Sequence, residues 1–242
     1  TSYSAPVFKI NLDLPLEERL KELHGHFGVM AKPIVDKVLE TLKKHVGGPL
    51  GLFVLKQAVR AFLYARAPSY LFDEINSYSQ ATGIPISIIA LMNVFYEFDG
   101  TACTTMMVRL PDNTLAFGSN LDFHFSVELS KLNYKSEVSR GGKVMYYANA
   151  IYGLVGVLRG VVPGKFYVSI NERYGNGDTF RNLYFHEGHE ALYHLRYIME
   201  TATDFDSALD LARNHKLLAR AYYSIMGTNA NQACVVERSE RE

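Results

Sequence analysis

The spacing of apolar residues changes at residue 103 from a helical to a strand-like pattern, and this change limits the folds that the chain can adopt. Before it, apolar residues recur mainly at helical spacing, as one run shows: Ile34, Val35, Val38, Leu39, Leu42 and Val46. After it, short segments of strand composition alternate with turn residues such as Pro111-Asp112-Asn113 and Gly141-Gly142. We therefore expect an α+β protein in which a mainly helical segment, residues 1–102, precedes a strand-rich segment, residues 103–242.

Within the first segment, Tyr3–Leu14 is predicted to be extended, and a helical pattern begins at Pro15. Gly47-Gly48-Pro49 is expected to break the chain. The following stretch, Leu50–Tyr64, is more apolar than an ordinary surface helix but short for a membrane span. A buried core helix is the favoured interpretation, and a helix that lies on a membrane surface is the alternative.

The second segment contains several stretches of strand length and two helical stretches. The predicted strands are Thr104–Val108, Leu115–Phe117, Lys143–Ala148, Leu154–Leu158, Phe166–Ile170, Tyr222–Met226 and Ala233–Val236. The predicted helices are Asn182–Thr201 and Asp204–Leu217, the second with Asp204 as its N-cap.

Composition and charge exclude some classes of protein. Of the 242 residues, 48% are hydrophobic, and 25 basic side chains balance 25 acidic ones, as expected of a globular protein with a real core. Residues 1–102 carry 10 of each sign, so neither half has the basic excess that binding to nucleic acid requires. Two distant cysteines form no disulfide framework, and no Asn-x-Ser/Thr sequon is present. Because the chain starts without Met, we expect a processed product in which a signal peptide is no longer visible.

Cys103 stands at the point where the helical and strand-rich segments meet. A polar turn, Asp99-Gly100-Thr101, and the small Ala102 precede it, and Asp122 follows nineteen residues later. A thiol at the start of a strand, after a flexible turn, suits a chain that cuts itself there and leaves a cysteine whose own α-amine is the base. The alternative is a small, buried hydrophobic side chain, which is the commoner role of a single cysteine.

A group of histidines lies near residue 190. On a helix, His186, Glu190 and His194 fall on one face and have ligand chemistry for a metal. The spacing is not that of the His-Glu-x-x-His motif, so a solvated helix face is favoured and no metal is expected. Glycine-rich nucleotide-binding loops and the Gly-x-Ser-x-Gly elbow are also absent, and we expect no cofactor.

Several motifs, in order along the chain, resemble those of the acid ceramidase and N-acylethanolamine acid amidase family. They are Pro6–Asp13, Asn93–Glu97, Cys103-Thr104-Thr105, Gly118-x-Asn120-Leu121-Asp122, Tyr152–Leu158-x-Gly160, Pro163–Phe166, Asn171-Glu172-Arg173 and Ala221–Asn229. This resemblance implies an N-terminal nucleophile hydrolase, an αββα sandwich preceded by a mainly helical segment. It also implies a precursor that is cut between Ala102 and Cys103 into a helical α-subunit, 1–102, and a catalytic β-subunit, 103–242, which stay associated.

The resemblance also assigns roles to individual residues. Cys103 is the expected nucleophile, with a free α-amine of pKa about 8 beside a thiol of pKa about 8.5 in the absence of perturbation. Asp122 is expected to hold the amine, Asn229 to donate to the tetrahedral oxyanion, and Glu172 to lie near the site. The residues expected around the substrate are Ser119, Asn171, Arg173 and Gly156.

The chain departs from the family pattern at two points. The family has an arginine sixteen residues after the cysteine, where this chain has Ser119, and a serine cannot replace the planar guanidinium. Arg173 and Arg241 are the candidates for a substitute cation. The family chain also continues well beyond the equivalent of Asn229, so the sandwich is expected to be incomplete at its C-terminus.

These features predict a cysteine amidohydrolase that cleaves the amide bond of a fatty-acyl lipid, either ceramide or an N-acylethanolamine. The helix at 50–64 is the candidate for contact with a lipid surface. The resemblance implies a lysosomal or secretory-pathway protein. The alternative is a lipid-binding or regulatory relative without turnover, which Ser119 and the short C-terminus favour; a plain scaffold protein is a third interpretation.

Overall fold

A computed structural model describes residues 4–65, 68–95, 102–122, 126–173, 182 and 188–240. Some of the sequence-based expectations fall outside these ranges. They concern the turn at Asp99-Gly100-Thr101, the histidine His186 and the candidate cation Arg241.

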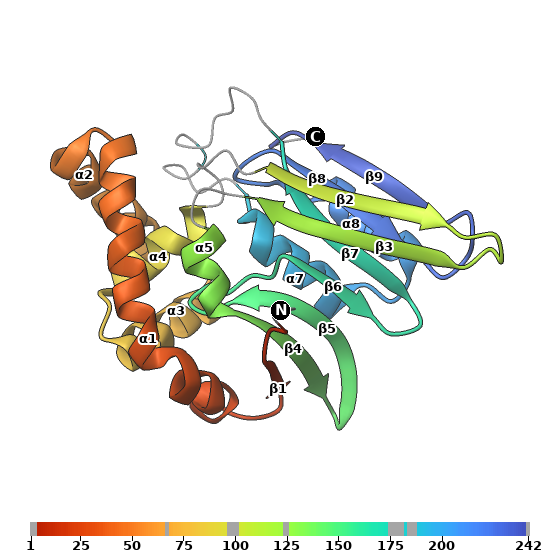
Figure 1. The fold of residues 1–242 in the computed structure, drawn as a ribbon, viewed down its shortest axis with the longest axis horizontal. Helices are drawn as coiled ribbons and strands as arrows, with labels where there is room; N and C mark the ends of the chain where they lie inside the picture. Colours follow the sequence, from red (N-terminus) through yellow and green to blue (C-terminus); the bar gives the residue numbers. More distant parts are fainter. Residues whose placement is uncertain are drawn as a thin grey trace.

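Four helices make up most of the N-terminal part and lie together at one end of the molecule (Figure 1). They are α1 (Leu16–His45), α2 (Gly48–Ala65), α3 (Ser69–Thr82) and α4 (Ile86–Phe95), and they follow strand β1 (Val7–Asn11). Helix α1 begins directly after Pro15, as predicted, and has Glu17 and Glu18 in its first turn, where carboxylates favour the helix dipole. The predicted break is confirmed, since Gly47 and Gly48 have φ angles of 81° and 78°, which side-chain-bearing residues rarely adopt.

A seven-stranded sheet forms the centre of the molecule, in the order β1-β4-β5-β6-β7-β8-β9. Its later strands are β4 (Asn133–Arg140), β5 (Lys143–Ile151), β6 (Arg159–Val162), β7 (Phe166–Glu172), β8 (Ala221–Met226) and β9 (Ala233–Arg238). Only the β1–β4 pair is parallel among these neighbours. The N-terminal segment therefore contributes a strand to the sheet of the C-terminal segment. The division at residue 102 stays a prediction.

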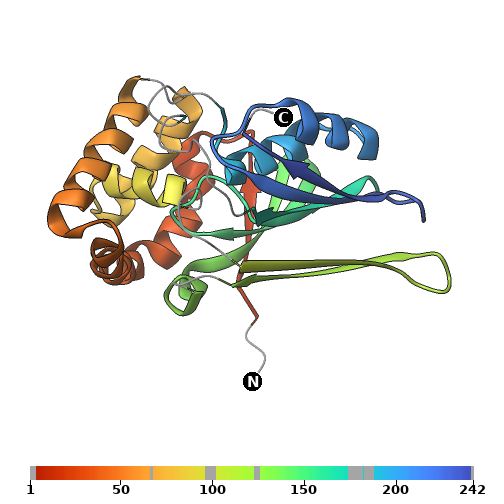
Figure 2. The same cartoon turned by 90° about the horizontal axis from the view of Figure 1, so that it is seen from above.

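The large sheet is covered differently on its two faces (Figure 2). Helices α7 (Ala191–Thr201) and α8 (Phe205–Asn214) pack on one face, and a two-stranded hairpin of β2 (Ala102–Arg109) and β3 (Leu115–Asp122) lies over the other. A short helix α5 (Ser126–Leu129) and a single 3-10 turn, Ser130–Leu132, connect the hairpin to β4. Helices, large sheet and hairpin form three successive layers, and the outer side of the hairpin leaves Met106 and Val108 exposed.

One sequence-based assignment in this region is wrong, and two strands, β4 and β6, are absent from the prediction. Residues Leu154–Leu158 are not a strand: Gly153 has a φ of 95°, and the chain then forms a buried loop before β6 begins at Arg159. Strand β4 is not predicted because its composition is mostly polar. In the structure every second residue, Tyr134, Ser136 and Val138, is buried, as in a strand with one face on the core. The other predicted strands are confirmed with longer boundaries.

The histidine cluster also differs from expectation. Of the predicted helix at 182–201, α7 covers Ala191–Thr201. The described residues just before it are not helical, since Gly188 has a φ of 113° and His189 pairs with Leu217. His194 is fully buried, and its Nδ1 lies 2.8 Å from the hydroxyl of Tyr223, so the solvated face is wrong.

Burial has opposite effects on two ionisable groups of this helix, because it disfavours the charged form of each. It lowers the pKa of His194 to about 3, and it raises the pKa of the Glu190 carboxyl to about 7. Among the described residues, no group of three potential ligands could hold a metal ion.

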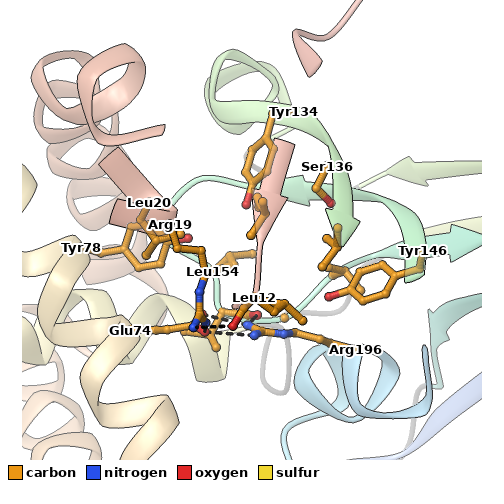
Figure 3. Close-up of a pocket in the computed structure, with 15 residues that line it drawn as sticks. Leu12, Arg19, Leu20, Glu74, Tyr78, Tyr134, Ser136, Tyr146, Leu154 and Arg196 are labelled. Carbon is orange, nitrogen blue, oxygen red and sulfur yellow. Dashed lines mark hydrogen bonds and ion pairs between the residues drawn. The ribbon is translucent and has the colours of Figure 1, made fainter. Parts of the chain in front are cut away.

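A buried ion pair joins the helical segment to the C-terminal segment (Figure 3). Arg196 of α7 donates to both carboxylate oxygens of Glu74 in α3, at 2.8 and 3.0 Å, and to the carbonyl of Val155 at 3.0 Å. The nitrogen Nε of Arg196 also donates to Glu200 at 2.7 Å. Glu74 is only 6% exposed, and Arg19 of α1 approaches it to 3.9 Å. Both polar groups are therefore satisfied within the core, and breaking the pair would leave a buried charge without its partner.

We expect Arg196→Ala to lower the free energy of unfolding by about 3–5 kcal/mol, because Glu74 would stay buried without its bidentate partner. Urea unfolding followed by circular dichroism measures this loss. The control is Lys32→Ala, which removes an exposed pair with Asp36 at 2.7 Å and should cost less than about 1 kcal/mol. Equal, small losses for both variants would contradict a structural role of the buried pair.

Candidate active site

The site is built on the β2–β3 hairpin, whose turn sets the strand register. Asn113 has a φ of 65°, and the side chain of Asp112 accepts a hydrogen bond from the backbone N–H of Thr114 at 2.9 Å. Hydrogen bonds from the side chain and backbone of Thr114 lower the pKa of Asp112, so the turn keeps an ionised acceptor. The resulting register pairs Cys103, the second residue of β2, with Leu121, the second-last residue of β3.

Side-chain hydrogen bonds hold the backbone of Cys103 against β7. The amide Nδ2 of Asn171 donates to the carbonyl oxygen of Cys103 at 3.0 Å, and its Oδ1 accepts from the hydroxyl of Thr105 at 2.8 Å. That hydroxyl also lies 3.1 Å from Ser169 Oγ. Asn171, which the sequence placed near the substrate, therefore bridges the two sheets at the nucleophile.

A narrow cleft lies between the hairpin and the large sheet at this point. Its lining includes Cys103, Ser119, Arg159, Ser169 and Asn171. The guanidinium of Arg159 donates from Nη1 to both the carbonyl oxygen and the hydroxyl of Ser119, the latter at 2.5 Å.

The hydroxyl of Ser119 has a second partner on the large sheet. Tyr167 donates to it at 3.1 Å, and the ring of Tyr167 stacks on Phe117 with a centroid distance of 3.6 Å. Ser119 therefore joins the hairpin to both β6 and β7.

Sequence reasoning missed Arg159. It lies in the Tyr152–Gly160 motif, where it is the only charged residue, and this charge within an apolar run was the available signal. Arg173, the candidate substitute cation, instead pairs with Glu237 of β9 at 2.5 Å, so a carboxylate neutralises its charge.

Asp122 and Glu172 are the last residues of β3 and β7, at the strand ends near Cys103. Their side chains point to the faces of these strands opposite those of Leu121 and Asn171. Asp122 is paired with Ala102, and its carboxylate accepts two hydrogen bonds of 2.9 Å from Asn120. Glu172 directly follows Asn171, and strand alternation turns its side chain to the face opposite that of Asn171. The structure thus places Asp122 beside the proposed cut and Glu172 at the end of β7.

The structure does not bring Asn229 to the nucleophile. Asn229 is exposed in the turn between β8 and β9, where its N–H donates to Gln232 Oε1 at 3.1 Å. The residue of β8 that pairs with Asn171 is Tyr222. The turn that contains Asn229 begins after Met226, which is about 13 Å from Tyr222 along β8 at the usual rise per residue. The expected oxyanion role of Asn229 is therefore corrected.

Gly156 has a packing role instead of the expected contact with substrate. It is buried in the loop before β6, and a Cβ atom placed on it would lie 2.3 Å from the backbone carbon of Leu192. The residue after it, Val157, donates to the carbonyl of Leu192 at 3.2 Å. Only a glycine allows the loop to approach α7 so closely.

The second cysteine does not belong to this site. Cys234 lies on β9, paired with Ile225, and burial raises the pKa of its thiol. A raised pKa disfavours the reactive thiolate, so Cys103 remains the candidate nucleophile.

We expect Gly156→Ala to lower the free energy of unfolding by about 3 kcal/mol, the upper part of the range for overpacking. Thermal unfolding is the measurement. Gly25→Ala is the control: nothing lies within 4 Å of its added Cβ, and alanine in a helix should stabilise by up to about 1 kcal/mol. A Gly156→Ala protein as stable as the parent would contradict the packing role.

Comparison with known proteins places these residues in a family context. The family described as linear amide C–N hydrolases, choloylglycine hydrolase family, matches residues 103–242, a range that begins at Cys103 itself. The chain is 28% identical to acid ceramidase of Macaca fascicularis over 98% of this chain and 64% of that protein. For acid ceramidase of Bos taurus the identity is 28%, over 100% of this chain and 66% of the relative. The chain thus spans a little less than two thirds of these relatives.

A solved structure supports the same fold. The Caenorhabditis elegans N-acylethanolamine-hydrolyzing acid amidase ortholog matches with a TM-score of 0.52 and 21% identity, over 57% of this chain and 60% of that chain. That neighbour has the N-terminal nucleophile hydrolase fold, so the predicted fold class is confirmed. The chain belongs to the choloylglycine hydrolase family of linear amide C–N hydrolases, and its predicted resemblance to acid ceramidase and N-acylethanolamine acid amidase is confirmed.

Proposed function

We propose that this chain is a cysteine amidohydrolase that cuts itself before Cys103 and then hydrolyses the amide bond of a fatty-acyl lipid. The observation that carries this proposal is the position of Cys103. It is the second residue of β2 and lines a cleft that contains a guanidinium, and the family match begins at the same residue.

Self-cleavage would follow from the chemistry of the thiol. Sγ of Cys103 attacks the carbonyl carbon of Ala102, and the peptide C–N bond breaks to give a thioester and a free α-amine on Cys103. Water then hydrolyses the thioester and releases the carboxylate of Ala102. The hydrogen bond from Asn171 to the carbonyl of Cys103 lies on the C-terminal side of the peptide bond that is cut. It would therefore hold the new N-terminus in place after the cut.

The same residue would then act on the lipid amide. The α-amine takes the proton of the thiol, the thiolate attacks the acyl carbon, and the proton passes to the leaving amine. A second water releases the fatty acid from the acyl-enzyme. We propose that Asp122, which pairs with Ala102 across the hairpin, holds the amine once the cut has freed it.

The substrate class follows from the relatives. The names of acid ceramidase and of the N-acylethanolamine-hydrolyzing amidase denote two lipids that share a fatty-acyl amide bond. The proposal covers either lipid, and a lysosomal or secretory-pathway location accords with such a substrate. The presence of Arg159 in the cleft favours the hydrolase over a binding protein without turnover, since the absence of a cation at Ser119 is one of the two features that favour that alternative.

The two segments would stay together after the cut. Strand β1 pairs with β4 over five residues, and the Arg196–Glu74 pair joins α7 to α3. The core is also continuous, with Phe27 of α1 stacked on Tyr152 at a centroid distance of 5.2 Å. These contacts do not depend on the peptide bond between Ala102 and Cys103.

Helix α2 is the proposed contact with lipid. It buries Leu52, Leu55, Val59, Phe62 and Leu63, as the core interpretation predicts. Its other side exposes Leu50 and Phe53, and it carries Lys56 and Arg60 but no acidic residue. An apolar face beside basic side chains suits an anionic membrane surface.

The described helices include none that is by itself long and apolar enough to span a membrane. Helices α1 and α2 meet the criteria of length and composition only as a pair bent by 113°.

We expect Cys103→Ala to abolish both self-cleavage and hydrolysis of a fluorogenic fatty amide, because the only proposed nucleophile is lost. The intact mass after incubation at about pH 4.5 and about pH 7.5 should show two fragments that meet between Ala102 and Cys103 in the parent protein. Cys234→Ala is the matched control and should keep both reactions. A Cys103→Ala protein that is still cut at this bond would rule out the thiol mechanism.

We expect Phe53→Glu and Val54→Glu to reduce co-sedimentation with vesicles that contain phosphatidylserine, because each places a charge on the apolar face of α2. Val54 is 59% exposed, so the substitution leaves the core intact. Val235→Glu, at a 58% exposed position on β9, is the control and should bind like the parent. Unchanged binding of the α2 variants would exclude this face as the lipid contact.

A further inference from the structure

We propose that Arg159 of β6 supplies the positive charge of the Cys103 site and favours the thiolate form of the nucleophile. This inference rests on the proposed function for its role in catalysis. Its physical content, a lower pKa of the Cys103 thiol, can be tested without turnover. Neither the family match nor the sequence motifs assign a role to Arg159.

The position of Arg159 in the sheet directs its side chain into the cleft. Arg159 pairs with Ser169 of β7, and residues paired across neighbouring strands present their side chains on the same face. Ser169 Oγ lies 3.1 Å from the hydroxyl of Thr105 on β2, so this face is the one that meets the hairpin. Arg159 therefore reaches toward the hairpin from the large sheet and lines the same cleft as Cys103.

In the part of the chain that the structure describes, no carboxylate pairs with Arg159. Its guanidinium donates to two neutral groups, the carbonyl and the hydroxyl of Ser119. Among the described residues it forms no ion pair, whereas Arg173 pairs with Glu237 and Arg196 with Glu74. A guanidinium with neutral partners keeps its full positive potential in the cleft, and a nearby cation lowers the pKa of a thiol.

Ser119 and Arg159 face each other across the gap between the hairpin and the large sheet. The small side chain at 119 leaves room for the guanidinium, and its hydroxyl accepts one of the bonds that orient it. Tyr167 donates to the same hydroxyl at 3.1 Å, which fixes the hydroxyl oxygen as an acceptor for Arg159. Because the two positions point at the same volume, a guanidinium placed there from 119 should replace one placed there from 159.

The test is the pH dependence of alkylation of Cys103 by iodoacetamide, in the full chain with Cys234→Ala so that one thiol reacts. Mass spectrometry of the peptide that contains Cys103 gives the rate. We expect Arg159→Gln to raise the apparent pKa of the thiol, with about tenfold slower alkylation at neutral pH for a shift of one unit. Arg159→Lys keeps the charge and should retain most of the rate.

Two further variants separate this role from a structural one. Arg173→Ala, which removes a cation already paired with Glu237, should leave the alkylation profile unchanged. The exchange of both residues, Ser119→Arg with Arg159→Ser, should restore the profile that Arg159→Gln loses. If Arg159→Gln does not fold, Arg159→Met, which also removes the charge and keeps a side chain of similar length, gives the same information.

The outcomes distinguish the two proposals. The role of Arg159 would be overturned if Arg159→Gln had the same alkylation profile as the parent. It would also be overturned if the thiol pKa of the exchange variant differed from that of the parent. A shifted profile in a protein that hydrolyses no fatty amide would support Arg159 and contradict the proposed function. Hydrolysis that falls together with alkylation in Arg159→Gln, and returns in the exchange variant, would support both.

Discussion

A short series of side-chain hydrogen bonds, from Thr105 to Asn171 and from Asn171 to the carbonyl of Cys103, fastens the β2–β3 hairpin to β7. An isolated two-stranded hairpin is at best marginally stable, so this contact with the large sheet decides where the nucleophile lies. The stacking of Phe117 on Tyr167 and the bonds to Ser119 extend the contact toward the turn. The cleft exists because these polar and aromatic contacts hold the two layers in one register.

The helical segment is part of this architecture and does not form a separate body. It supplies an edge strand to the large sheet, and its Glu74 receives the guanidinium of Arg196 inside the core. A bidentate pair of this kind needs both partners, because either one alone would be a buried charge. A chain cut at residue 103 would therefore keep its halves together through interactions that form before the cut.

Three arginines of the described structure differ in their partners and therefore in their roles. Arg196 and Arg173 are paired with carboxylates, and their charges serve the assembly of helices and strands. Arg159 has neutral partners and lines the same cleft as Cys103, where we propose that its positive charge favours the thiolate. Similar side chains thus differ in role because their neighbours differ, a property that no single position in the sequence reveals.

The sequence by itself determined the change from helical to strand-rich pattern, the strand that contains Cys103, most strand and helix positions, and the family resemblance. These features depend on local periodicity, turn residues such as Asn113 and motif order, all of which are written along the chain. Only the tertiary structure decided that Asn229 lies far from the nucleophile, that Gly156 packs on Leu192, and that His194 is buried. It also brought Arg159 to Ser119, forty positions earlier in the chain. The reason is that the pairing of β6 with β7 and the packing of the hairpin on them, and not proximity in sequence, set which side chains share the cleft.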